Sequence, residues 1–115
     1  SNIMLDPRCI VEVSPGANYI IPTYSVTNDG IQDGPEQAID FCKGNKEDET
    51  VLRQPGVFVE SLIEVAKRRL ESVNVPPLST RETATAITKL DEALMWLGKR
   101  SDDRKRREVE GTYRR

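Results

Sequence analysis

Residues 79–97 read STRETATAITKLDEALMWL, and this stretch decides the fold. Ser79 and Glu82 have the S-x-x-E spacing of a capping box, in which each side chain bonds the other residue's backbone amide. The apolar residues that follow recur at three- and four-residue intervals, the spacing of one helical face: Ile87, Leu90, Leu94 and Leu97. The stretch therefore predicts an amphipathic helix that begins near Thr80.

A second helical pattern precedes this one, over residues 57–73. Pro55-Gly56 and Pro76-Pro77 flank it, and neither pair continues a helix. The residues expected to form its packed face are Phe58, Leu62, Val65, Ala66, Leu70 and Val73. The short connection predicts an antiparallel pair. Each helix buries only one stripe, so the β region, a second subunit or both must cover the remaining apolar surface.

The first half of the chain has the composition of short strands and turns. Residues 8–14 are β-prone and end at the turn signal Pro15-Gly16. In residues 18–26, Pro22 removes a ladder donor, which predicts an edge strand or an extended arm. Residues 37–42 alternate like a half-buried strand. Turn-forming or polar residues predict loops in the remaining segments: residues 28–30, 33–35 and 45–50.

The fold class expected from these patterns is α+β. A small N-terminal antiparallel β region occupies residues 4–56, and a long antiparallel two-helix hairpin with a basic tail occupies residues 57–115. The length of 115 residues suits one domain. Apolar residues make up 37% and charged residues 31%, which allows only a thin core and favours an oligomer.

Composition also narrows the function classes. The chain has no histidine, and its two cysteines, Cys9 and Cys42, are not in a CxxC motif, which argues against a metal centre and for reduced thiols. It has no apolar run long enough to span a membrane. We therefore expect a cytoplasmic protein. Eight of the 17 Lys and Arg residues lie between Lys99 and Arg115, a local density that attracts phosphate.

Four runs carry a resemblance to a known family: RETA at 81–84, AITKLDEALMWL at 86–97, RSDDR at 100–104 and VEGT at 109–112. The chain resembles the phage hairpin-domain family that includes the anti-CBASS sponge, directed against cyclic-oligonucleotide signalling, and the Thoeris anti-defence sponge, directed against cyclic ADP-ribose-type signals. The likeness is strong from about Val57 to Arg115 and weaker back through residues 39–41. Two departures bear on ligand choice: residues 51–56 replace a common Gly-Val-Asn-Gly run, and Glu108 replaces a common glycine.

The resemblance implies a phage counter-defence protein that binds and sequesters a cyclic nucleotide immune messenger, a cyclic oligonucleotide or a cyclic ADP-ribose isomer, without cleaving it. It also implies a homodimer or hexamer with ligand pockets at subunit contacts, in the host cell cytoplasm. No cofactor, membrane or specific nucleic acid is expected. The alternative is a phage structural or regulatory scaffold that uses the hairpin for protein contacts. An enzyme is disfavoured because the chain lacks histidine and a metal-type carboxylate cluster.

Cationic side chains are the first candidates for an anionic ligand, because a guanidinium fork suits phosphate. The candidates are Arg81, Lys89, Arg100, Arg104 and Arg107. Arg81 lies in the first turn of the predicted helix, where the positive end of the helix dipole favours an anion. The alternatives are a solvated Arg81, and ion pairs of the later arginines with Asp102, Asp103 and Glu108.

Four further residues are ligand-binding candidates. Trp96 lies just off the apolar stripe and serves either as a purine-stacking platform or as an aromatic anchor between subunits. Thr83 can turn its hydroxyl to the preceding turn or to a ligand, whereas a structural role is favoured for Thr88. Gly111 and Thr112 offer a backbone N–H and a hydroxyl to phosphate, or form a simple C-terminal turn.

Overall fold

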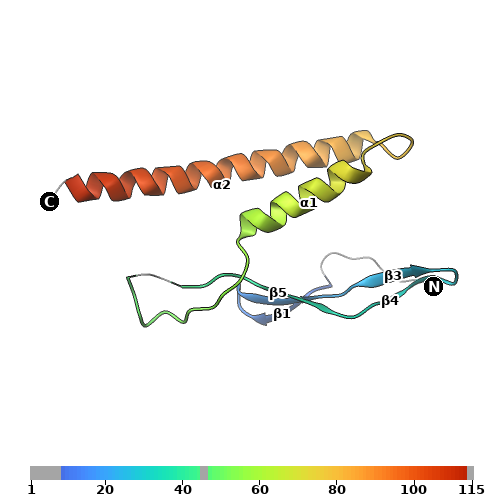
Figure 1. Ribbon diagram of the computed structural model, residues 1–115, viewed down its shortest axis with the longest axis horizontal. Coiled ribbons are helices and arrows are strands. Elements are labelled where there is room, and N and C mark those ends of the chain that lie inside the picture. The colour runs from blue at the N-terminus through green and yellow to red at the C-terminus, as the bar shows by residue number, and fades with distance from the viewer. Residues whose placement is uncertain (1–8, 45–46, 114–115) are drawn as a thin grey trace. The chain divides into compact units, whose positions relative to one another are not determined.

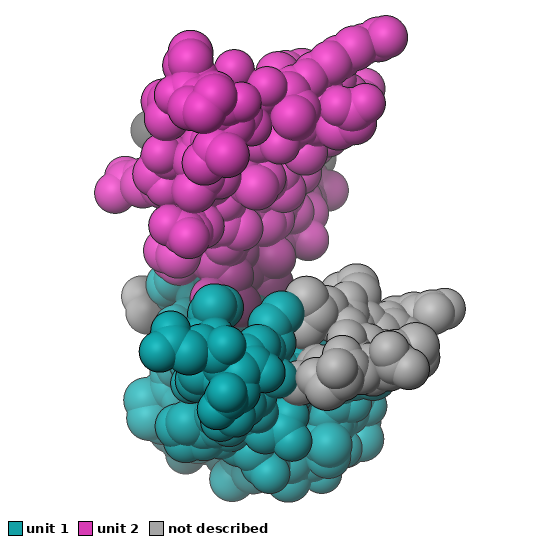
Figure 2. All heavy atoms as spheres, turned by 90° about the vertical axis from the view of Figure 1, so that its right-hand side faces the viewer, with its two compact units in different colours: residues 1–58 teal, residues 59–115 magenta. Residues whose placement is uncertain are grey.

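The computed structural model describes residues 9–44 and 47–113, with only the backbone described for 109–113. The chain divides into two compact units, one up to Phe58 and one from Val59 (Figure 2). Two of the predicted segments lie partly outside the described residues. They are the first strand, at Arg8, and the loop over residues 45–50, at Asn45 and Lys46.

The first unit contains a three-stranded antiparallel sheet with the strand order β1-β2-β5. Figure 1 labels β1 and β5 of this sheet. Its strands are β1 (Val11–Ser14), β2 (Asn18–Ile21) and β5 (Gln37–Asp40). The turn between β1 and β2 uses a positive φ of 66° at Gly16, which confirms the predicted Pro15-Gly16 turn. The strands predicted within residues 8–14 and 37–42 are also confirmed.

A second pair of strands, β3 (Tyr24–Thr27) and β4 (Gly30–Asp33), forms an antiparallel hairpin closed by Asn28-Asp29. The prediction for residues 18–26 was therefore wrong. The segment contains two strands, and the first of them is central in its sheet rather than at the edge. Pro22 lies in the break between β2 and β3, so its missing N–H removes no ladder bond. Gly30 and Asp33, which were predicted as turn residues, are instead the two ends of β4, which pairs with β3.

The two ladders run consecutively, since β2 pairs with β5 and β3 pairs with β4. Ile21 faces Gln37 whereas Tyr24 faces Asp33, so the register shifts by one residue between the ladders. The amide of Gly34 donates to Thr23 O at 2.8 Å in this break. Proline stands on both sides of the break, at positions 22 and 35, where no ladder donor is required.

The segment after β5 folds back along its own backbone. The amide of Cys42 donates to Val57 O at 3.0 Å, and Val57 donates to Asp40 O at 2.9 Å. Gly56 stands at this close approach, and a Cβ there would overlap Asp40 O and the Phe41 carbonyl carbon. The first unit's interior is thin, because Ala17 alone is fully buried among the described hydrophobic residues. The amide of Phe41 donates to Ala17 O at 2.8 Å, and the Phe41 ring makes an edge-to-face contact with Tyr19 at a centroid distance of 5.8 Å.

The second unit is an antiparallel helical hairpin of α1 (Val59–Val73) and α2 (Arg81–Tyr113), and α2 extends past the start of α1 (Figure 1). The predicted stripe of α2 is confirmed, because all four of its apolar residues are half-buried. The stripe of α1 was partly wrong. Val65 is 64% exposed and Ala66 is also exposed, and Phe58 is 63% exposed and precedes the helix. Ile63, which was not assigned to the stripe, is half-buried. A single neighbouring helix covers a narrower arc than the whole apolar face of α1.

Polar contacts also join the two helices. Lys67 Nζ lies 2.9 Å from Asp91 Oδ1 on α2 and 3.1 Å from Glu64 Oε2 on its own helix. The hydrogen bond to Asp91 and, next, the contact with Glu64 raise the pKa of Lys67 above its usual value. The Lys67 side chain is only 18% exposed, so its aliphatic part packs in the hairpin while its ammonium group pairs with the two carboxylates.

The start of α2 differs by one residue from the predicted capping box. Thr80, not Ser79, is the N-cap, since its Oγ1 accepts the Thr83 amide at 3.1 Å. The Thr80 amide in turn donates to Asn74 Oδ1 at 3.1 Å, just after the end of α1. Asn74 thereby ties the end of one helix to the start of the next, which explains why the cap falls at Thr80.

We predict that Thr80→Ala lowers the free energy of unfolding by about 1 kcal/mol, the usual effect of losing a threonine N-cap. Ser79→Ala is the matched control and should change stability by less than about 0.5 kcal/mol. Urea denaturation followed by circular dichroism measures both. The reverse order of effects would restore the capping box at Ser79 and contradict the structure.

Two glycines give a second prediction. Gly56→Ala should destabilise the protein by roughly 1–3 kcal/mol, because the added methyl overlaps backbone that cannot move aside. Gly98 lies within α2 with open space around its Cα, so Gly98→Ala should stabilise by roughly 0.5–1 kcal/mol. Melting temperatures of the two variants should shift in opposite directions, and a shared direction would contradict the assignment.

Candidate functional site

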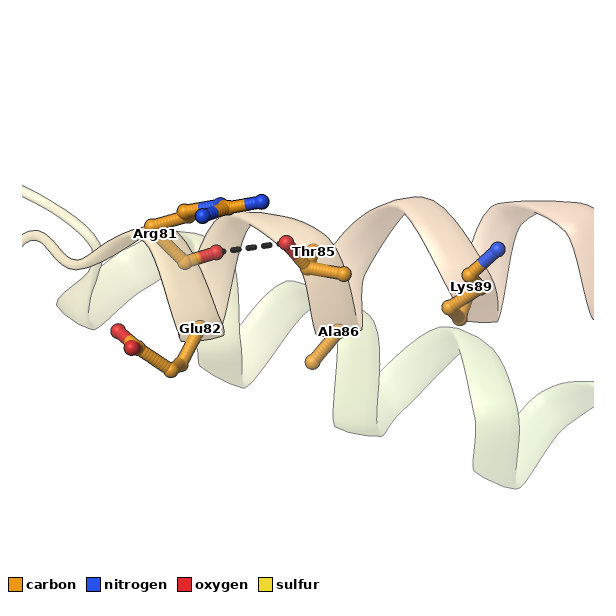
Figure 3. A pocket seen from close by; sticks show the side chains of 5 residues that line it. All are labelled: Arg81, Glu82, Thr85, Ala86 and Lys89. Atoms are coloured by element: carbon orange, nitrogen blue, oxygen red, sulfur yellow. Dashed lines mark hydrogen bonds between the residues drawn. The ribbon is translucent and has the colours of Figure 1, made fainter.

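The first two turns of α2 form an open depression. It has a volume of about 500 Å³ and is lined by Arg81, Glu82, Thr85, Ala86 and Lys89 (Figure 3). The four-residue spacing of Arg81, Thr85 and Lys89 places them along one side of the helix. The Thr85 hydroxyl donates to Arg81 O at 2.8 Å, which fixes its orientation. The helix thus brings together two of the predicted cationic residues, Arg81 and Lys89.

The electrostatics of the depression favour a small anion. Arg81 has no ion pair within the described part of the chain. Lys89 lies 3.6 Å from Glu92, and both side chains are mostly exposed, so this pair is weak. Glu82 adds one negative charge to the lining, while the N-terminal end of α2 adds positive potential. Arg81 can offer two parallel donors to an anion such as phosphate.

The threonines of the first turns are largely engaged within the helix. Thr83, predicted to bind ligand, is half-buried, and its Oγ1 lies 2.9 Å from Thr80 Oγ1 in the N-cap. The Thr88 hydroxyl donates to Ala84 O at 3.2 Å, as its structural interpretation predicted. Thr83 therefore orders the first turn below Arg81, and Thr85, which the sequence reasoning missed, is the threonine that lines the depression.

The other predicted arginines lie far along α2. Arg81 and Arg107 are 26 residues apart, a rise of about 39 Å at 1.5 Å per residue. Arg100 lies 3.9 Å from Glu60 in a loose, exposed pair. Arg104 and Arg107 are exposed and have no ion pair with any described residue. Asp103 instead pairs with Arg106 at 3.3 Å, so the alternative that Asp103 neutralises Arg104 or Arg107 was wrong.

Trp96 lies between these two cationic regions. Its side chain is 60% exposed, and Lys99 Nζ lies 5.5 Å from the ring centroid. Gly111 and Thr112 belong to the last turns of α2, so a tail turn at these residues was wrong, and their side chains lie outside the described part.

Neither a metal-type cluster nor a membrane-spanning helix occurs in the described part of the chain. No group of three or more acidic or cysteine side chains among residues 9–44 and 47–108 is arranged to hold a metal ion. No described helix combines the length and apolar content required to cross a bilayer.

Comparison with known proteins places these features in a family. The model of the Acb2/Tad1 hairpin domain matches residues 33–101, which is more than half of the chain. The chain belongs to the Acb2/Tad1 hairpin family. A relative from Bacillus phage SBSphiJ7, named Thoeris anti-defense 1, is 50% identical over 58 residues. That match covers 50% of this chain but only 41% of the relative, so the chain spans less than half of that protein's length.

The Acb2/Tad1 match confirms the resemblance stated from the sequence, but it covers a different range of residues. It begins at residue 33, earlier than the strong part of the predicted likeness, and it ends at residue 101. Arg81, Thr83, Lys89, Trp96 and Arg100 lie inside it. The remaining predicted residues lie beyond it: Arg104, Arg107, Gly111 and Thr112. The depression at the start of α2 therefore lies wholly within the family's domain.

We predict that pyrophosphate, a probe with no base or sugar, perturbs the backbone amide resonances of residues 81–89 in the full chain. Arg81→Ala should reduce the affinity about tenfold, because a charge-assisted bidentate contact is lost. Arg68→Ala is the matched control, since Arg68 is a 74% exposed arginine on α1 outside the depression. Perturbations spread evenly over all exposed arginines, or equal effects of both substitutions, would show that the depression is no anion site.

Proposed function

We propose that this chain acts as a phage anti-defence protein that binds a cyclic nucleotide messenger and withholds it from its effector without cleaving it. The observation that carries the proposal is the Arg81–Lys89 depression within the matched Acb2/Tad1 domain. The relative's name assigns that protein to anti-Thoeris defence, and cyclic ADP-ribose isomers or cyclic oligonucleotides are the ligand classes whose phosphates suit paired cations.

Capture without turnover is supported by the residue types at hand. The chain contains no histidine, the commonest general base near neutral pH. The depression contains two cations, one carboxylate and one hydroxyl already bonded to the backbone. Such a set can bind and orient phosphate through hydrogen bonds. It supplies neither an activated nucleophile nor an acid and base pair.

Self-association is part of the proposal. Exposed apolar side chains occur on both units, including Val11 and Val13 on β1 and Val65 on α1. Burial of these surfaces between copies of the chain would stabilise an oligomer. An oligomer would also let cations from different copies converge on one ligand. Within one copy, Arg81 and Arg107 are too far apart to do so, because 26 residues of helix give a rise of about 39 Å. We expect this chain to bind its messenger in the host cytoplasm.

The test is isothermal titration calorimetry of the full chain against cyclic dinucleotides, cyclic trinucleotides and cyclic ADP-ribose isomers. We expect saturable heat from at least one class, and recovery of that ligand with unchanged mass after the complex is denatured. No saturable heat from any class would favour the scaffold alternative. A cleaved product would show an enzyme instead.

For the ligand that binds, Arg81→Ala and Lys89→Ala should each weaken the affinity by about tenfold, since each removes one charge-assisted contact to phosphate. Arg68→Ala should leave the affinity within about twofold, because it changes an exposed cation of the same kind outside the depression. Circular dichroism of all three variants checks that the hairpin is intact. Equal affinities in all three variants would contradict the assignment of this site.

A further inference from the structure

The sole tryptophan is displayed on a rigid element with little protein cover. Trp96 lies in the middle of α2 and is 60% exposed. Its ring N–H has no hydrogen-bond partner within the described residues. The helix thus fixes the backbone of Trp96 and leaves a broad flat ring that faces solvent, which suits stacking against another flat ring.

A cation is already placed over this ring. Lys99, one turn further along α2, has its Nζ 5.5 Å from the indole centroid, within the range of a cation–π interaction. Lys99 forms no ion pair within the described residues. Its ammonium group therefore retains its capacity to bind an anion while it lies beside an aromatic face.

A second cation lies one residue beyond. Arg100 is four residues from Trp96, a rise of about 6 Å, so it lies on the same side of the helix. Its contact with Glu60 is 3.9 Å long, and the Arg100 side chain is 71% exposed. An exposed pair of this length is weak, so a phosphate can replace Glu60 at little cost.

We propose that Trp96, Lys99 and Arg100 form a nucleotide half-site, in which the indole stacks on the base while the two cations bind the adjacent phosphate. This inference rests on the proposed function and deepens it, because it adds recognition of the base to recognition of phosphate. The half-site is distinct from the Arg81 depression, since Arg81 and Trp96 are separated by a rise of about 22 Å along the helix.

The charges around Trp96 favour a nucleotide over an apolar protein surface. Glu92 and Lys99 lie within about one turn of it, and both residue types are depleted at protein interfaces. A partner's apolar surface would have to strip water from both cations. A nucleotide provides a flat ring for the indole and an anion for the cations at once.

The experiment uses the fluorescence of Trp96, the only tryptophan, in the full chain. Adenosine 5′-monophosphate should quench it, and inorganic phosphate at the same ionic strength should not, because only the nucleotide brings a stacking base. Lys99→Gln should weaken the quenching, and Lys99→Arg should restore it because arginine keeps the charge and the cation–π contact. Quenching by phosphate alone, or absence of quenching by the nucleotide, would overturn the half-site.

Calorimetry separates this inference from the proposed function. For a messenger that binds the wild type, Trp96→Ala should reduce affinity by roughly ten- to hundredfold, the range for loss of one stacked base, and Trp96→Phe by less. Met95→Ala is the matched control, since Met95 is 59% exposed and lies about 100° around the helix from Trp96. An unchanged affinity in Trp96→Ala would overturn the half-site while the proposed function stands. If no messenger binds, the proposed function fails, and the nucleotide titration alone decides the half-site.

Discussion

The packing of α1 against α2 is the constraint on which the rest of the second unit depends. Half-buried leucines on both helices form this contact, and the Lys67–Asp91 hydrogen bond sets its register from the polar side. Every cationic residue considered for ligand binding lies on α2. A slip of the helices by one turn would separate Lys67 from Asp91 and Arg100 from Glu60, so the contact that stabilises the hairpin also determines which residues of α1 pair with those of α2.

Periodicity predicted the helices well because it reports local geometry directly. Leu90 and Leu94 are half-buried as their spacing indicated. The same reasoning assigned Val65 to the packed face and omitted Ile63, because the spacing of apolar residues does not show how much of the α1 surface α2 will cover. The strands were harder: β4 is four residues long with glycine at its start, and only its pairing with β3 makes it a strand.

The cationic residues of the candidate site were predicted from the sequence, but the contacts of its threonines were not. Arg81 and Lys89 were expected as phosphate ligands, and they do line one depression. A sequence repeat could not show that Thr83 is engaged by Thr80, since that depends on a cap shifted by one residue. Thr85 and Lys99 were missed, although the four-residue interval from Arg81 and the three-residue interval from Trp96 were visible signals for each.

The thin interior has a thermodynamic consequence. Ala17 is the one described hydrophobic residue that is fully buried, so unfolding a single copy exposes less new apolar surface than unfolding a well-packed domain of the same length. Exposure of apolar surface is what gives unfolding its positive heat capacity change. A single copy therefore has a shallow dependence of stability on temperature, and added burial against a ligand or a second copy would make the curve steeper.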